Sequence, residues 1–232
     1  IQNNQLTYFG NFINDDYKTI ESYNIQNLRK TNYTSHKGGI ANFYISKKLN
    51  DSIDVEKINN NLKKYINKYA SFFKISIPKS KANVLFHSNL KEMINMIGMW
   101  GLSCGGNSAG MNVRGEVHCI GTNQGLINHE ISHHVFNSNI PAEKLPPLLL
   151  EGVVEVYTNY EKPNLYKERI KNVHNNWAKF NFKELLENGS SFYNSNSSLN
   201  YEVAGIWVKY FIDAYGLKTF KSLCHSDNKI TF

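Results

Sequence analysis

Residues 126–137 read LINHEISHHVFN and carry the strongest signal in the chain. Their apolar side chains recur at the three- and four-residue spacing of a buried helix, and Gly121 and Gly125 allow a turn into its start. Two histidines and a glutamate on such a helix are costly to bury without a partner. The stretch therefore predicts a core helix whose polar side chains hold a metal ion.

Within this stretch, residues 129–133 form the pattern His-Glu-x-x-His. Residues four apart lie on one face of a helix, so His129 and His133 can offer two imidazole nitrogens to a single ion. Glu130 lies beside that face, where its carboxylate can reach a water molecule on the metal and act as the catalytic base. Zinc is the usual metal for two histidines and a carboxylate, so we expect one zinc ion per chain.

A catalytic zinc ion needs a third protein ligand. The segment LEGVVE (150–155) follows a connection that contains three prolines, and Glu151 lies 18 residues after His133. Glu155 is one turn further along the same helical face, so from spacing alone either carboxylate could be the ligand. The remaining one would accept a hydrogen bond from a ligand imidazole and orient it, as metal sites commonly require.

This combination resembles the gluzincin zinc metallopeptidases, the clan of thermolysin-like and aminopeptidase-like enzymes. There an HExxH motif is followed at this distance by a Glu-Gly-x-x-Glu element, and the resemblance selects Glu151 as the third ligand. Tyr201, which opens the stretch YEVAG, is similar to the tyrosine that stabilises the transition state in aminopeptidase-like members. The resemblance covers about residues 115–225 and implies a zinc peptidase with Tyr201 as the hydrogen-bond donor to the oxyanion.

One element of the aminopeptidase-like members is missing. They carry a strand of pattern Gly-x-Met-Glu-Asn before the motif, whose glutamate binds the free amine of the substrate. This chain has only Gly110-Met111-Asn112 in that region. The resemblance therefore favours an endopeptidase acting on a protein or peptide over an aminopeptidase. The strand expected over 116–120 could bind an extended substrate by backbone pairing.

Two other functions remain open. A binding or adhesion module could keep the fold, and even the zinc, without turnover, although it would not need Glu130. A zinc-dependent hydrolase of a non-peptide substrate, such as a glycan-linked amide, also fits, because nothing in the sequence defines a specificity pocket. His87 and His118 lie in strand-like stretches and are expected to be ordinary core or surface residues. His134 points off the metal face of its helix and is expected to be structural or exposed.

The resemblance implies a zincin-like α+β fold, with a strand-rich N-terminal part and a mostly helical C-terminal part around the active-site helix. We expect a single catalytic domain over 1–232, made of a mixed subdomain over 1–125 and a helical subdomain over 126–232 with the active-site cleft between them. β-branched and aromatic stretches predict strands over 40–46, 73–77, 83–87 and 116–120. Apolar repeats and their boundaries predict helices over 55–71, 90–97, 126–137, 146–160, 164–179, 201–215 and 217–224. The Ser- and Asn-rich tract 189–200 is expected to be an exposed loop.

Composition limits the partners. The chain has 232 residues, of which 41% are hydrophobic, and no apolar run approaches the roughly 20 residues that span a bilayer, so we expect no transmembrane segment. The net charge of +7 is scattered rather than gathered into a basic stripe, so nucleic acid is not an expected partner. Cys104 and Cys119 could form a disulfide in an oxidising compartment. With the start at Ile1 without a leader and the habits of the clan, this favours a secreted or cell-envelope bacterial protein.

Overall fold

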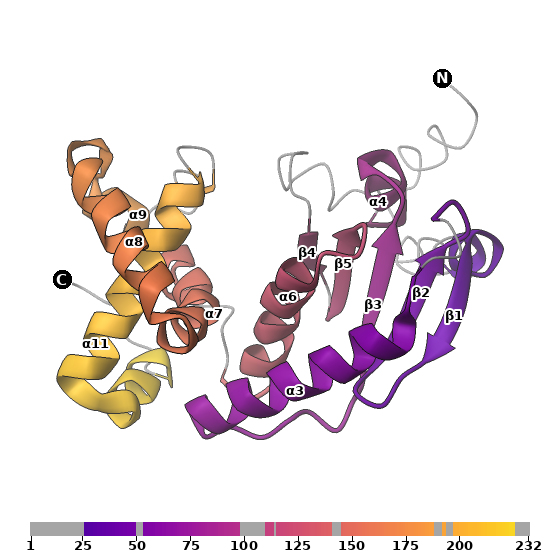
Figure 1. Cartoon of the computed structure of the whole chain (residues 1–232), viewed down its shortest axis with the longest axis horizontal. Coiled ribbons are helices and arrows are strands. Elements are labelled where there is room, and N and C mark those ends of the chain that lie inside the picture. Colours follow the sequence, from indigo (N-terminus) through magenta and orange to yellow (C-terminus); the bar gives the residue numbers. More distant parts are fainter. Residues whose placement is uncertain are drawn as a thin grey trace, which may run out of the picture. The chain divides into compact units, whose positions relative to one another are not determined.

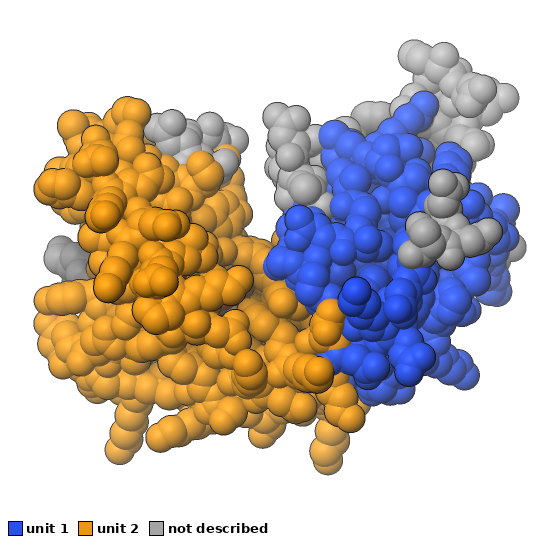
Figure 2. Space-filling view, in the orientation of Figure 1, with its two compact units in different colours: residues 1–60, 81–127 blue, residues 61–80, 128–232 orange. Residues whose placement is uncertain are grey.

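The computed structural model describes residues 26–49, 53–97, 110–113, 115–140, 145–187, 192–193 and 197–225. The chain forms two compact units, which Figure 2 shows in different colours. The first unit contains residues 1–60 and 81–127, and the second contains residues 61–80 and 128–232. The predicted α+β class is confirmed, with a mixed sheet in the first unit and a mostly helical C-terminal part. The expected boundary at residue 125 and the active-site cleft stay predictions.

The first unit contains a five-stranded sheet with the order β1-β2-β3-β5-β4 (Figure 1). Its strands are β1 (Tyr33–Lys37), β2 (Ala41–Ser46), β3 (Ala82–His87), β4 (Gly110–Val113) and β5 (Glu116–Ile120). Strands β2, β3 and β5 run parallel, and β1 and β4 pair with their neighbours antiparallel. Parallel strands are usually buried on both faces, which explains why β3 buries five of its six side chains.

The core of the first unit forms where side chains from neighbouring strands meet. The ring of Phe43 in β2 stacks on that of Phe86 in β3, with centroids 6.1 Å apart, and both side chains are fully buried. Helix α4 (Leu90–Ile97) lies against β3 and β5 and buries two methionines and Ile97. This packing fixes the sheet that precedes the predicted metal-binding motif in the sequence.

The second unit is mostly helical (Figure 1). Its elements are α7 (Pro147–Glu161), α8 (Pro163–Asn175), the 3₁₀ helix η1 (Trp177–Lys179), α9 (Phe182–Glu187) and α11 (Ser197–His225), together with the later parts of α3 (Val55–Phe73) and α6 (Gln124–Asn137). Proline occupies the first position of α7 and of α8, where its missing N–H costs nothing. Gly216, with φ of 84°, interrupts α11, so the helices predicted over 201–215 and 217–224 are confirmed as two segments joined at this glycine.

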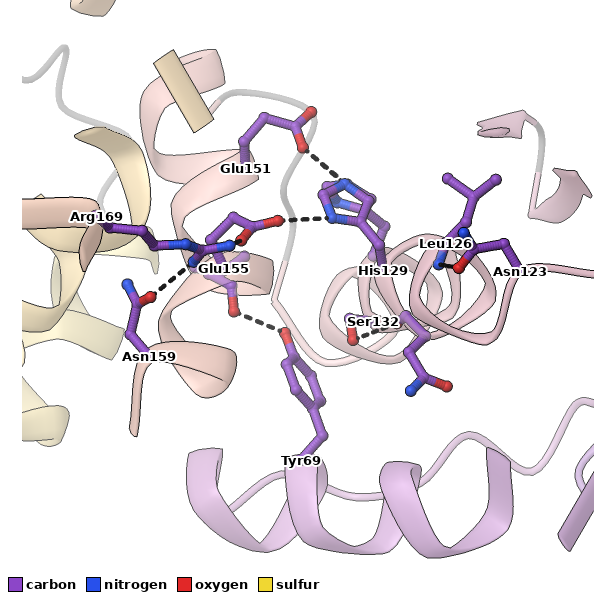
Figure 3. Close-up of polar contacts among 12 residues, drawn as sticks. Tyr69, Asn123, Leu126, His129, Ser132, Glu151, Glu155, Asn159 and Arg169 are labelled. Carbon is purple, nitrogen blue, oxygen red and sulfur yellow. Dashed lines mark hydrogen bonds and ion pairs between the residues drawn. The ribbon is translucent and has the colours of Figure 1, made fainter. Parts of the chain in front are cut away.

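Aromatic side chains from three helices hold the second unit together. The ring of Tyr69 in α3 lies 4.9 Å from that of Phe73 and 5.8 Å from that of Tyr157 in α7. The ring of Phe73 lies 5.4 Å from that of Phe136 in α6. Tyr69 also donates a hydrogen bond to the carbonyl of Val153 over 3.2 Å, a contact visible in Figure 3. These contacts fix α6 relative to α7, the two helices that carry the predicted metal ligands.

The strand predicted over 73–77 is wrong. Phe73 is the last residue of α3, and residues 75–78 have no regular structure. The side chain of Phe73 is fully buried between Tyr69 and Phe136, so tertiary packing extends the helix beyond its predicted end. A short apolar run of this kind cannot be assigned to a helix or a strand by periodicity alone.

The strand predicted over 116–120 is confirmed as β5, but its expected pairing with substrate is wrong. β5 lies between β3 and β4 and pairs with both, so its backbone N–H and C=O groups are committed to the sheet. The edge strand β4, which contains Gly110-Met111-Asn112, and the edge strand β1 were not predicted. Both are short, and four of the five residues of β1 are exposed, so neither gives a clear alternating pattern.

The exposed loop predicted over 189–200 is wrong for the residues that the structure describes there. Residues 192–193 are helical, and α11 begins at Ser197. The side chain of Phe192 is fully buried, and Nδ2 of Asn200 donates a hydrogen bond to its carbonyl over 2.8 Å. One buried aromatic side chain therefore anchors a tract whose composition is otherwise that of a solvated loop.

The described helices and cysteines bear on the expectations about a membrane segment and a disulfide. None of the described helices is long and apolar enough to cross a bilayer. Cys119 in β5 and Cys224 in α11 are both buried. Cys104 lies outside the described residues, so a disulfide between Cys104 and Cys119 stays a prediction.

His87 and His118 form a buried pair in the first unit. The hydroxyl of Tyr33 lies 2.7 Å from Nδ1 of His87, and Nε2 of His87 lies 3.0 Å from Nδ1 of His118. The two rings are nearly parallel, with centroids 5.2 Å apart. Burial lowers the pKa of each imidazole to about 3, and the neighbouring His118 contributes to the shift at His87. Both histidines are therefore neutral core residues at neutral pH.

We expect this pair to make the chain less stable as the pH falls from about 6.5 toward 3. Over that range the unfolded chain binds protons that the folded chain does not, so the free energy of unfolding decreases. Urea unfolding at about pH 7 and about pH 5 measures the loss, which should be smaller in His87→Gln because an amide does not titrate. His36→Gln, at an exposed position of β1, should match the unmodified chain. Equal losses in all three proteins would contradict the expectation.

Candidate metal centre

The turn before α6 sets where the helix begins. Gly121 has φ of 69°, a left-handed conformation that glycine adopts without strain. Oδ1 of Asn123 accepts hydrogen bonds from the backbone N–H groups of Gly125 and Leu126, at 2.9 and 3.2 Å. Figure 3 shows the contact between Asn123 and Leu126. The helix therefore starts at Gln124, slightly before the predicted residue 126.

His129, His133 and Glu151 lie together in the second unit, as predicted. Nε2 of His129 and Nε2 of His133 each lie 3.2 Å from Oε2 of Glu151. One ligand atom from each of the three residues falls within 4.8 Å of the other two, and the group could hold a metal ion. Figure 3 shows His129 on α6 directed toward Glu151 and Glu155 on α7.

The two carboxylates that spacing alone left undistinguished occupy different places. Glu155 lies behind His129, where its Oε1 is 3.1 Å from Nδ1, the ring nitrogen that does not face Glu151. Nδ1 of His129 can therefore donate to Glu155 while Nε2 stays directed at the cluster. Glu151 alone of the two faces the Nε2 atoms of both histidines. The geometry thus favours Glu151 as a ligand and Glu155 as the residue that orients His129.

Arg169 of α8 supports Glu155 from the other side. Its guanidinium lies 2.7 Å from Oε2 of Glu155 and also donates to Oδ1 of Asn159 over 2.7 Å (Figure 3). The Arg169 and Glu155 side chains are largely buried, at 16% and 14% exposure, so the pair is shielded from water. The Glu155 carboxylate is thus held at both oxygens, with His129 at Oε1 and Arg169 at Oε2.

The charges of the cluster favour a cation at its centre. Burial alone would lower the pKa of His129, but hydrogen bonds to Glu151 and Glu155 and the charges of nearby carboxylates raise it to about 10. Burial likewise acts to raise the pKa of Glu151, but the charges of His133 and His129 and the hydrogen bonds from both hold it well below its usual range. A buried carboxylate that needs positive charge, facing two imidazole nitrogens, is a donor set that fits zinc.

Glu130 and Tyr201 also belong to this neighbourhood. Glu130 is only 7% exposed, and its charge contributes to the raised pKa values of His129 and Tyr201. The ring of Tyr201, on α11, lies 5.7 Å from that of His129 and 5.5 Å from that of Phe192. The structure therefore brings both candidate catalytic residues close to His129, while their roles in a reaction stay predictions.

Two glycines let α11 approach α7 closely enough to place Tyr201. A Cβ atom at Gly152 would lie 2.7 Å from the carbonyl oxygen of Ala204 and even closer to Val208. A Cβ atom at Gly205 would lie 2.7 Å from Cβ of Glu155. The glycine next to Glu151 in the Glu-Gly element therefore has a packing role, because any side chain there would push α11 and Tyr201 away from the site.

Two residues of the site, Arg169 and Tyr193, were not predicted from the sequence. Arg169 gave no signal, because an arginine in a predicted polar helix is ordinarily solvated. Tyr193, whose hydroxyl lies 2.9 Å from Oε1 of Glu151, belongs to the tract that was predicted to be an exposed loop. The aromatic pair Phe192-Tyr193 within that polar tract was the one available signal.

Comparison with known proteins adds no further constraint, because no family model, curated protein or solved structure matches this chain.

Proposed function

We propose that the chain is a zinc-dependent peptidase of zincin-like fold and of the gluzincin clan, acting on internal bonds of a protein or peptide in the cell envelope or outside the cell. The observation that carries the proposal is the convergence of His129, His133 and Glu151 in a largely buried group. Glu130, also buried, is next to the first ligand in the sequence and supplies the carboxylate that hydrolysis requires.

His129, His133 and Glu151 would hold the ion, with Glu155 and Arg169 keeping His129 in place. A zinc ion there would supply a Lewis acid that activates water and polarises a carbonyl group. Glu130 takes the proton of the attacking water and delivers it to the leaving amine. Tyr201 donates a hydrogen bond to the oxygen that becomes negative. Burial and the charges of Glu151, Glu130 and Glu155 raise the pKa of Tyr201, so its hydroxyl keeps its proton at neutral pH.

An endopeptidase is favoured over an aminopeptidase because β4 carries Gly110-Met111-Asn112 without the glutamate that would bind a free amine. Metal content and turnover test the proposal together. Elemental analysis of the intact chain should give about one zinc per chain, and a chelator should abolish cleavage of a peptide library whose members have blocked N-termini. His129→Ala should contain no stoichiometric zinc. Zinc without cleavage would favour the adhesion-module alternative, and absence of zinc after loading would overturn the metal site.

Tyr201→Phe tests the oxyanion role. We expect kcat to fall about 100- to 1000-fold, the cost of deleting one oxyanion donor elsewhere, with KM and zinc content unchanged. Tyr210→Phe, at a position of α11 that is 62% exposed, is the matched control and should keep full activity. Full activity of Tyr201→Phe would remove the residue from the mechanism without affecting the rest of the proposal.

A further inference from the structure

The two oxygens of the Glu151 carboxylate have different neighbours. Oε2 lies 3.2 Å from Nε2 of His129 and 3.2 Å from Nε2 of His133, so this oxygen belongs to the metal-binding cluster. Oε1 points away from the histidines and lies 2.9 Å from the hydroxyl of Tyr193. A carboxylate can only accept and a phenol is protonated at neutral pH, so Tyr193 donates this hydrogen bond.

Tyr193 is held in place by its neighbour rather than by its own burial. Its side chain is 45% exposed, whereas Phe192 is fully buried. The ring of Phe192 packs 5.2 Å from that of Tyr193 and 5.5 Å from that of Tyr201, and its carbonyl accepts a hydrogen bond from Asn200. An exposed ring anchored in this way adds little apolar burial, yet its hydroxyl reaches a carboxylate that is 7% exposed. Its hydroxyl therefore makes a buried contact with Glu151 although much of the side chain is exposed.

The hydrogen bond limits what Glu151 can do. A carboxylate with two free oxygens can bind an ion through one oxygen or through both, and the second mode fills a position that a catalytic site keeps open. A hydrogen bond to Oε1 makes that oxygen a poorer ligand and leaves Oε2 directed at the cluster. The same arrangement recurs at Glu155, where one oxygen faces His129 and the other is held by Arg169.

We propose that Tyr193 is a positioning residue that holds Oε1 of Glu151, so that Glu151 binds zinc through Oε2 alone and one position on the ion stays open. The inference rests on the proposed metal site but not on any peptidase activity. It assigns Tyr193 and Tyr201 different tasks, although the ring of Phe192 packs against both. Tyr193 acts on the ligand, whereas Tyr201 acts on the substrate.

Metal binding by the purified full chain tests this assignment without a substrate. Zinc affinity is measured by competition with a chromophoric chelator, and the visible spectrum of the cobalt-loaded chain reports the number of ligands, because five-coordinate cobalt absorbs more weakly than four-coordinate cobalt. Tyr193→Phe should weaken zinc binding about 10- to 100-fold, as loss of a residue that orients a ligand does elsewhere, and should shift the cobalt bands to lower intensity. Tyr201→Phe and the exposed-surface control Tyr210→Phe should match the unmodified chain in both measurements.

The outcomes separate the two proposals. If the unmodified chain binds neither metal, the metal site itself fails and this inference fails with it. If the unmodified chain binds both metals and Tyr193→Phe matches it in affinity and spectrum, only the inference is overturned. Urea unfolding in the presence of a chelator completes the test. An unchanged midpoint in Tyr193→Phe, together with weaker zinc binding, supports positioning, whereas a midpoint that falls enough to explain the weaker binding assigns Tyr193 an ordinary structural role.

Discussion

The Glu130→Gln variant is expected to keep about one zinc per chain and to lose about 100- to 10,000-fold in kcat, the usual contribution of a positioned general base. The amide has nearly the same size as the carboxylate, and Glu130 is not one of the three clustered ligands, so the metal site should survive. The amide cannot take a proton from water, so the attack step loses its base. Initial rates on a blocked fluorogenic peptide and elemental analysis of the same sample measure both quantities.

Two results would contradict this expectation in different ways. Retained turnover would show that Glu130 is not the general base, and the proposed hydrolytic mechanism would be wrong. Loss of zinc together with turnover would show that Glu130 maintains the site rather than performing chemistry on the substrate. Glu168→Gln, on the exposed side of α8, is the matched control and should keep both zinc and activity. The same pair of variants also tests the adhesion-module alternative, since a site that only binds would be indifferent to Glu130.

The helices that carry the predicted ligands could themselves be predicted because their signals are local. The apolar spacing of residues 126–137 and the proline-bounded start of α7 each lie within about a dozen residues. The role of Glu155 could not be predicted from the residues in the same way. Glu151 and Glu155 lie on one helical face, and what separates them is which nitrogen of His129 each one contacts. That difference arises only when α7 packs against α6.

Tyr193 and Arg169 were not predicted for the same reason, because their contacts in the site are long-range. Tyr193 lies 42 positions from Glu151, and Arg169 comes from a helix whose composition suggests a solvated surface. No local pattern connects either residue to the carboxylate that it contacts. The wrong strand at 73–77 has a related origin, since the burial of Phe73 against Phe136 of α6 is a long-range contact that the short run itself does not encode. Local patterns therefore predicted the two helices and the histidines, the family resemblance selected Glu151, and only tertiary contacts reveal Tyr193 and Arg169.

His133→Ala is expected to remove both zinc and activity, because it deletes one of three ligands and leaves Glu151 with a single imidazole neighbour in the cluster. Zinc should therefore raise the unfolding temperature of the unmodified chain, since a ligand that binds only the folded state stabilises it, and should have no such effect on His133→Ala. Differential scanning calorimetry with and without added zinc measures the shift directly.

His134→Ala is the control that separates the loss of a metal ligand from the loss of packing in α6. His134 is the next residue of α6 but lies outside the metal-binding group, and its Nε2 has no hydrogen-bond partner among the described residues. Its removal deletes a partly buried side chain that is not a predicted ligand, so any loss of stability common to both variants reflects packing in the helix. A zinc-dependent shift that survives in His134→Ala and disappears in His133→Ala would assign the metal to the side chain that faces Glu151. If zinc raises the unfolding temperature of both variants, zinc binds elsewhere on the chain, and the proposed hydrolytic site would be wrong.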